Sequence, residues 1–195
     1  MSLRSHQVND LDNFIGGWYI EDTSICDDLI SYFKNNPHKN PGSVKSIEGS
    51  LIDNEVKVSV DCDLDQSPEY ISYNVELQKV CLKYIEKYPW CNGYNPWTIT
   101  QGINIQYYPP GGGFYKWHTE RSCPIHPYSA RHLVFMTYLN TVNEGGETEF
   151  FHQKVKIKPE KGLTIIWPSD WTFTHRGLTS VEEEKYIVTG WYNYT

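Results

Sequence analysis

Several features that define other classes of protein are missing from this sequence. None of its 5 cysteines lies in a CxxC pair, and the odd count does not suit a disulfide scaffold. The N-terminus has no apolar leader, and the longest aliphatic runs are far shorter than a membrane span. We therefore expect a cytoplasmic protein with reduced thiols, no structural zinc and no membrane partner.

Basic charge is also scarce. The chain has 17 Lys and Arg against 24 Asp and Glu, a formal net charge of −7. Tight binding to a phosphate backbone depends on clustered Lys and Arg side chains. This balance argues against a nucleic-acid partner, although the net charge would not reveal a local basic groove.

Aromatic residues, by contrast, are abundant, at 15% of the 195 residues, and Gly and Pro are scattered through the second half. This mixture is typical of short strands joined by turns and disfavours an all-helical fold. The length suits one domain with its own core. We predict a single domain in which residues 1–97 form a mixed helical supporting region and residues 98–195 form the β core.

The first predicted helix spans residues 24–34 and is capped by Thr23 or Ser24. A loop rich in Asn, Pro and Gly follows at residues 35–43, and strand-like alternation comes later. The apolar side of the helix is marked by Ile25, Leu29, Ile30 and Phe33, and the alternation by Val56, Val58 and Val60.

A second helix is predicted for residues 68–88, with Pro89 as its stop. Its apolar residues recur at helical spacing and predict one buried stripe along its length. The members of this stripe are Ile71, Val75, Leu77, Val80, Leu82 and Ile85.

The second half of the chain has the residue pattern of β-strands. Five runs are separated by Gly, Pro and Asn turns: TITQGINIQYY, RHLVFMTYLN, KVKIKP, GLTIIWP and EKYIVTGWYNY. Such spacing favours a sandwich or a barrel. The residues that carry chemistry are expected in this half.

Three residues of this half can converge on a metal ion. On a strand, positions i and i+2 project from the same face, so His118 and Glu120 can point to one place. His175 follows the strand GLTIIWP and its turn. Two imidazoles and one carboxylate on one face of an octahedron leave the other face open, as in non-haem Fe(II) oxygenases. An HxE triplet alone is common, and the alternative is a histidine that is exposed or simply hydrogen-bonded.

Lys185 helps to decide between a metal site and an ordinary histidine. The alternation in EKYIVTGWYNY puts Lys185, Ile187, Thr189 and Trp191 on one face of the strand. A Lys that follows three Glu is usually a solvated charge at a strand entry. If its face is the barrel interior, however, the ammonium needs an anionic partner, which a ligand carboxylate near the metal would supply.

With these residues in place, the second half resembles the prolyl-4-hydroxylase-like branch of the 2-oxoglutarate and Fe(II)-dependent dioxygenases. The likeness covers about residues 102–191, in ordered pieces: YYPPGGGFYKWHTE, YLNTVNEGGETEF, KPEKGLTIIWP, THRGLTS and EKYIVTGW. It implies a mainly β fold with flanking helices around a double-stranded β-helix, the jelly-roll core of cupin-like proteins. It also implies hydroxylation of an organic substrate with Fe(II), 2-oxoglutarate and O₂, releasing succinate and CO₂.

The resemblance further implies roles for individual residues. The metal ligands would be His118, Glu120 and His175. Lys185 would form a salt bridge with the distal carboxylate of 2-oxoglutarate, to which Tyr138 would donate a hydrogen bond. Tyr108 would line the iron site. The remaining pocket wall would be Thr148, Thr189 and Trp191, for which ordinary packing is the alternative.

One residue departs from the family pattern, because most members have Asp where this chain has Glu120. Glu is one methylene longer, so it must fold back or bind from a shifted backbone. If it chelated the metal through both oxygens, it would occupy an open position. We expect an active enzyme that retains iron more weakly than members with Asp.

Loops should determine the substrate, as they do on most rigid barrels. The expected rim consists of a mobile loop at residues 109–113 together with residues 121–130 and 171–174, whereas the N-terminal half would only buttress the barrel. The aromatic and proline content of the rim suits a peptidyl-proline. Free amino acids, other peptide side chains and small metabolites remain open.

Gly145 and Gly146 are expected to form a turn that delivers Thr148 and Phe150 into the barrel, or merely a flexible hairpin.

Two other functions fit the same scaffold. One is a non-catalytic jelly-roll module that binds a ligand beside a vestigial metal site. The other is an oxidative nucleic-acid demethylase, which the acidic balance disfavours. A zinc hydrolase would leave Lys185 and the ordered motifs unexplained.

Overall fold

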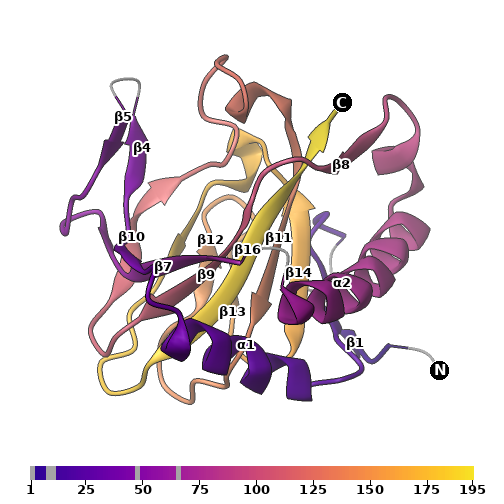
Figure 1. Ribbon diagram of the computed structural model, residues 1–195. Coiled ribbons are helices and arrows are strands. Elements are labelled where there is room, and N and C mark those ends of the chain that lie inside the picture. The colour runs from indigo at the N-terminus through magenta and orange to yellow at the C-terminus, as the bar shows by residue number, and fades with distance from the viewer. Residues whose placement is uncertain (1–2, 8–11, 47–48, 65–66) are drawn as a thin grey trace.

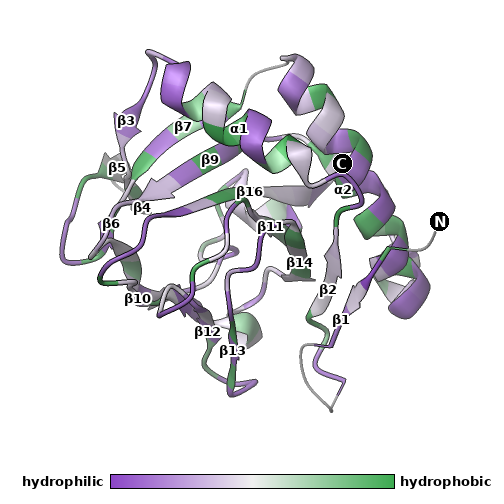
Figure 2. Cartoon of the chain, turned by 90° about the horizontal axis from the view of Figure 1, so that it is seen from below, coloured by the Kyte–Doolittle hydropathy of each residue, from purple (hydrophilic) through white to green (hydrophobic). Residues whose placement is uncertain are grey.

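The computed structural model describes residues 3–7, 12–46, 49–64 and 67–195. A larger and a smaller antiparallel sheet lie face to face, and α1 (Ser24–Asn35) and α2 (Pro68–Lys87) cover the outer face of the larger sheet (Figures 1 and 2). The predicted mainly β jelly-roll with flanking helices is confirmed. Among the described residues, no helix has the length and hydropathy needed to cross a membrane.

The larger sheet joins both halves of the chain. β16 (Lys185–Tyr194) lies at its centre between β11 (Arg131–Tyr138) and β9 (Ile103–Tyr108). On the β11 side follow β14 (Leu163–Pro168), β2 (Gly16–Tyr19) and β1 (Ser5–His6). On the β9 side follow β7 (Val60–Leu64) and β3 (Asn40–Pro41), and β8 (Trp97–Ile99) pairs with the end of β16.

The smaller sheet comes mainly from the second half. Its order is β13 (Val155–Ile157), β12 (Thr148–Phe150), β15 (His175–Gly177), β10 (Gly113–His118) and β6 (Lys57–Val58). A separate hairpin pairs β4 (Val44–Ser46) with β5 (Gly49–Leu51). Short 3₁₀ turns occupy Pro89–Asn92, Tyr128–Ala130 and Trp171–Phe173.

Two apolar cores follow from this layering. One lies between the helices and the larger sheet, where Leu29 and Leu77 pack with Ile105 and Phe135. The other lies between the sheets and includes Val134, Met136 and Tyr138 from β11. Because strand side chains alternate, the central strands β9, β11, β14 and β16 contribute to both cores. This places the inner residues of β11 and β16 beside the cavity described below.

The first helix begins at Ser24 as predicted and ends one residue later than predicted, at Asn35, but its cap differs. Neither Thr23 nor Ser24 caps it through its side chain in the expected way. Instead, the Asp22 carboxylate accepts hydrogen bonds from the backbone and the hydroxyl of Ser24, at 3.0 and 2.6 Å. Asp competes well for this role because its short side chain reaches nearby backbone N–H groups.

The second helix begins at Pro68 as predicted and ends at Lys87, but its buried side was predicted only in part, because Leu77, Val80 and Ile85 pack in or against the core whereas the other three do not. Ile71, Val75 and Leu82 are 60%, 55% and 63% exposed, while Leu77 and Val80 are buried. The buried face is instead completed by Tyr73, Glu76, Cys81 and Tyr84. Glu76 is tolerated there because it accepts from the backbone of Glu21 and from Lys79.

This correction predicts opposite outcomes for two matched substitutions on α2. Leu77→Ala should cost about 2–5 kcal/mol of unfolding free energy, because it leaves a cavity in the core. Leu82→Ala should change it by about 0.5 kcal/mol or less, because the side chain already faces water. Urea unfolding of both variants measures the difference, and equal losses would mean that α2 is rotated about its axis relative to the described packing.

Candidate metal centre

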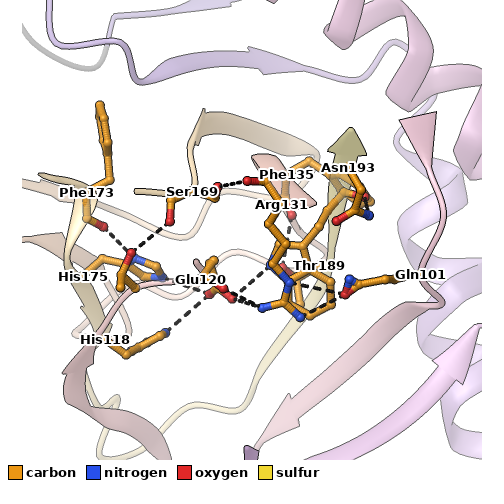
Figure 3. A network of polar contacts seen from close by, with 12 residues as sticks. Gln101, His118, Glu120, Arg131, Phe135, Ser169, Phe173, His175, Thr189 and Asn193 are labelled. Atoms are coloured by element: carbon orange, nitrogen blue, oxygen red, sulfur yellow. Dashed lines mark hydrogen bonds and ion pairs between the residues drawn. The ribbon is translucent and has the colours of Figure 1, made fainter. Parts of the chain in front are cut away.

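The pairing of two short strands brings the predicted metal ligands together. His118 at the end of β10 lies directly opposite His175 at the start of β15. Glu120 follows two residues after His118, and its Oε1 lies 3.6 Å from Nε2 of His118 and 3.5 Å from Nε2 of His175. The three ligand atoms lie within 4.8 Å of one another. Figure 3 shows the three side chains pointing to one place.

Both imidazoles are fixed by backbone carbonyls. Nδ1 of His118 donates to the carbonyl of Lys116, and Nδ1 of His175 donates to that of Phe173, each at 2.9 Å. Since a carbonyl can only accept, these bonds place the ring hydrogen on Nδ1 and leave the Nε2 lone pair free for a metal. The ring of Phe114 stacks on His118 with centroids 3.7 Å apart, which fixes the plane of the imidazole.

The charges in this group suit a divalent cation. Burial, together with the neighbouring His175, lowers the pKa of His118 to about 3. Burial alone would raise the pKa of Glu120, but His175, His118 and Arg131 together outweigh it and lower this pKa to about 2. At neutral pH His118 is therefore neutral and Glu120 is ionised, which is the state that metal binding requires.

Lys185, predicted from the sequence to bind an anionic ligand, lines the same cavity as the three predicted metal ligands. Its side chain is buried, and Nζ donates to the carbonyl of Gly146 at 2.8 Å. Within the described part of the chain, no carboxylate oxygen lies within 4.0 Å of this ammonium. Burial lowers its pKa to about 8, with partial compensation by Glu147. A buried ammonium without a counterion fits an anionic ligand.

The remaining predicted residues surround this ammonium in different ways. Lys185 lies opposite Tyr108 across the β16–β9 pair, with Nζ 4.8 Å from the centre of the Tyr108 ring. The Tyr138 hydroxyl is fully buried and donates to Oγ1 of Thr148 at 2.7 Å. Thr148 lines the cavity, whereas Tyr138 stands behind it. Tyr138 therefore reaches a ligand only if its hydroxyl leaves Thr148.

Thr189 and Trp191 lie further along the same face of β16. The Thr189 hydroxyl donates to the carbonyl of Phe135 at 3.1 Å. Nε1 of Trp191 donates to Oε2 of Glu120 at 2.9 Å. Both line the cavity, but Trp191 also binds Glu120, a predicted metal ligand. Sequence reasoning placed it only in the pocket wall.

Arg131, at the start of β11, is a site residue that sequence reasoning missed. Its Nη1 donates to Oε2 of Glu120 at 3.1 Å, and its side chain is buried. No motif in the sequence marks it. The residue becomes recognisable only when β11 is paired with β16, which brings it beside Trp191 and Glu120.

The cavity around these groups has a volume of about 1300 Å³. One wall comes from the N-terminal half, so the expectation that this half only buttresses the barrel is wrong. Its lining residues include Asn40, Asp53, Lys57, Asp61 and Asp63. The antiparallel pairing of β7 with β9 places this segment beside the inner strands. In the sequence, the alternation of Asp61 and Asp63 in VDCDL was the available sign that one face of this strand is polar and lines a cavity.

The predicted rim is also partly corrected. Residues 121–130 line the cavity through Ser122, Pro127 and Tyr128. Neither 109–113 nor 171–174 contributes a lining residue. A hydrogen bond from the Gly111 amide to the Ser180 carbonyl holds the first of these loops against the segment before β16.

Gly145 and Gly146 both have positive φ and form the predicted turn, and Thr148 and Phe150 beyond it are buried.

The fold and the site together indicate a class of protein. A jelly-roll with two imidazoles and one carboxylate in its cavity, beside a buried unpaired ammonium, fits a non-haem iron oxygenase with an anionic cosubstrate. Residues 103–193 match the family model of the 2OG-Fe(II) oxygenase superfamily. This match identifies residues 103–193 as a 2OG-Fe(II) oxygenase domain, a 2-oxoglutarate-dependent dioxygenase, and that family implies Fe(II), 2-oxoglutarate and O₂.

Solved structures show the same fold at low sequence identity. A Pseudomonas putida prolyl-4-hydroxylase is 16% identical, with a TM-score of 0.68 over 93% of each chain. A viral collagen prolyl hydroxylase from Paramecium Bursaria Chlorella virus-1, in its 2OG complex, is 20% identical, with a TM-score of 0.66 over 94% of this chain and 97% of that chain.

A prolyl hydroxylase from Trichoplax adhaerens, in complex with a hypoxia inducible factor peptide fragment, is 18% identical. Its TM-score is 0.72 over 93% of this chain and 84% of that chain. No curated protein matches this sequence as a relative.

The lowered pKa of Lys185 predicts how stability depends on pH. Between pH 8 and 10.5 the unfolded chain binds a proton at Lys185 that the folded chain does not, so the free energy of unfolding should rise across this window. Below pH 8 the folded protein carries the full desolvation cost of the ammonium. Lys185→Met should therefore stabilise the ligand-free protein at pH 7 by about 3 kcal/mol and remove this part of the pH dependence.

Urea unfolding at pH 7 and pH 10 measures both effects. Lys158→Met is the matched control, because Lys158 is exposed on the surface. A Lys185→Met variant that is less stable than the wild type at pH 7 would contradict the prediction.

Proposed function

We propose that this enzyme hydroxylates a proline or a related side chain within a peptide. In this proposal His118, Glu120 and His175 hold Fe(II), and Lys185 holds the distal carboxylate of 2-oxoglutarate. The observation that carries the proposal is that a convergent metal-ligand set and a buried, unpaired ammonium share one cavity. We also propose a reducing, cytosolic location, because the five cysteines include no CxxC pair and their odd count does not suit a disulfide scaffold.

The residues of the site have separate tasks in this chemistry. When bound, Fe(II) and 2-oxoglutarate supply the oxidation, in which 2-oxoglutarate and O₂ give succinate, CO₂ and a hydroxylated substrate. The two imidazoles and Glu120 would hold the ion, because their ligand atoms converge on one place. Lys185 orients the cosubstrate by pairing with its far carboxylate. Apolar walls from Met136, Trp167 and Ile187 exclude water from the space between.

A peptide substrate is supported by the size of the cavity and by the structural neighbours. A volume of about 1300 Å³ exceeds that of a typical small-molecule site. It therefore leaves room for a residue of an extended chain beside the cosubstrate. The Trichoplax adhaerens neighbour was solved with a peptide fragment, and the others are named as prolyl hydroxylases.

The proposed metal and cosubstrate residues make a direct prediction. Anaerobic Fe(II) and 2-oxoglutarate should produce a weak visible charge-transfer band in the wild type. His175→Ala should abolish this band by removing a ligand. Lys185→Met should raise the 2-oxoglutarate concentration needed for half-saturation by about tenfold or more, because one charge-assisted pair is lost.

In the control, Lys158→Met should titrate like the wild type. A band of full intensity in His175→Ala would remove His175 from the metal site. Unchanged 2-oxoglutarate affinity in Lys185→Met would reject the role of the ammonium.

The substrate class has its own test. A library of short peptides, each with a central proline, is incubated with the enzyme, Fe(II), 2-oxoglutarate and O₂. Mass spectrometry should find addition of one oxygen atom to the proline of at least one sequence, with an equal amount of succinate. Free proline should react poorly, because it cannot occupy the outer part of the cavity. Turnover of free proline alone, with no peptide modified, would replace the peptide proposal by an amino-acid hydroxylase.

A further inference from the structure

The carboxylate ligand of the proposed metal site raises a geometric problem. Glu120 has a flexible side chain long enough to bind a metal through both oxygens. Chelation by both would occupy a position that two oxygens of 2-oxoglutarate and O₂ need, because the two histidines already fill two of about six positions on iron. An active enzyme with Glu at this place must prevent that mode.

The two carboxylate oxygens are in fact held in different surroundings. Oε1 faces the two imidazoles, 3.6 Å from Nε2 of His118 and 3.5 Å from Nε2 of His175. Oε2 turns the other way and accepts from Nη1 of Arg131 at 3.1 Å and from Nε1 of Trp191 at 2.9 Å. In Figure 3 Arg131 approaches Glu120 from the side opposite the two histidines.

Arg131 is itself fixed on every side. Nη1 also donates to the backbone carbonyl of Glu120 at 3.0 Å, so both the side chain and the backbone of the ligand residue are bound. Nε and Nη2 donate to Oε1 of Gln101 at 3.3 and 3.0 Å. The guanidinium lies 3.5 Å from the centre of the Trp191 ring and 4.7 Å from that of Tyr128. Its side chain is only 9% exposed.

Because Arg131 is held in place, moving Oε2 of Glu120 away from it would be energetically costly. If Oε2 swung toward a metal, it would leave two donors, one of them a buried guanidinium whose only carboxylate partner in the described residues is Glu120. Separating a buried ion pair leaves an uncompensated charge, which is strongly unfavourable. Planar, pre-organised Arg donors also lose little entropy on binding, so the bond to Oε2 is well defined.

We propose that Arg131, with Trp191, is a positioning residue that restricts Glu120 to a single metal bond through Oε1. The remaining positions then stay open for 2-oxoglutarate and O₂. This inference rests on the proposed metal site, and it explains how the longer carboxylate can stand where Asp is usual. The structure thus assigns to the start of β11 a function in metal geometry.

The test separates metal binding from cosubstrate binding. Arg131→Met keeps the length of the side chain but removes the guanidinium donors to Oε2 of Glu120 and to Gln101, which leaves Trp191 as a donor to Oε2. Anaerobic Fe(II) titration should give an affinity within about threefold of the wild type or tighter, because chelation through both oxygens replaces the lost support. Half-saturation of the charge-transfer band by 2-oxoglutarate should require about tenfold more cosubstrate, and the band should shift in wavelength, because the coordination has changed.

Two further variants keep the test decisive if Arg131→Met does not fold. Trp191→Phe retains a ring for stacking but removes one donor, so it should shift 2-oxoglutarate half-saturation in the same direction by about threefold. Arg131→Lys restores a cation near Oε2 and should recover part of the loss. The matched control is Arg121→Met, since within the described part of the chain Arg121 pairs with Asp170, at 2.5 Å, and forms no hydrogen bond or ion pair with Glu120.

The outcomes distinguish the inference from the function on which it rests. If the wild type binds no Fe(II), the proposed metal site fails. If the wild type binds Fe(II) and 2-oxoglutarate but Arg131→Met and Trp191→Phe bind 2-oxoglutarate equally well, the positioning role is rejected and the proposed function stands. A loss of Fe(II) affinity with unchanged 2-oxoglutarate affinity also overturns it, because Arg131 would then only hold Glu120 in place.

Discussion

The site depends on the register of β16 between β9 and β11. In this register Lys185, Thr189 and Trp191 face the cavity, while Tyr186, Val188 and Tyr192 pack under the helices. A slip of one residue would exchange the two sets and move the ammonium and the donor to Glu120 out of the cavity. Gly190 helps to fix the register, because it lies against the ring of Phe135, where any Cβ atom would clash. The chemistry of the cavity is therefore encoded in strand pairing as much as in the identity of the ligands.

The two charged groups in the cavity, Glu120 and Lys185, differ in the partners that the protein gives them. At the metal end Glu120 is paired with Arg131 and Trp191 before any ion arrives. At the other end the ammonium of Lys185 donates, among the residues that the structure describes, a hydrogen bond only to the carbonyl of Gly146. The metal end is thus pre-organised, and the lysine end carries a desolvation cost that a ligand carboxylate would relieve. Cosubstrate binding should accordingly be coupled to the stability of the fold, since the ligand completes an ion pair that the protein leaves open.

The sequence was informative wherever a short-range pattern decides the structure. Period-two alternation located β9, β11, β13, β14 and β16 but not the short strands β12 and β15. The spacing of His118 and Glu120 correctly indicated two side chains that meet, although β10 ends at His118 and Glu120 lies two residues beyond it. It failed where distant packing decides. On α2 the exposed Ile71 and Leu82 look more apolar than the buried Glu76, whose burial depends on partners elsewhere in the fold. Arg131 could not be found either, because nothing near it in sequence contains its partners Glu120 and Trp191. The wall of the cavity formed by the N-terminal half was missed for the same reason.

That wall also reaches a proposed metal ligand through one intervening side chain. Lys57 on β6 is buried, pairs with Asp61 at 2.7 Å, and lies 5.7 Å from the centre of the Phe114 ring. Phe114 in turn stacks on His118, and β6 pairs with β10 through Val58 and Gly113. The orientation of the first imidazole is therefore supported by residues from the part of the chain that precedes the family match. Because β6 and β7 complete both sheets around the cavity, we infer that the two halves fold as one unit, and that residues 103–193 alone would leave one face of the metal centre open to water.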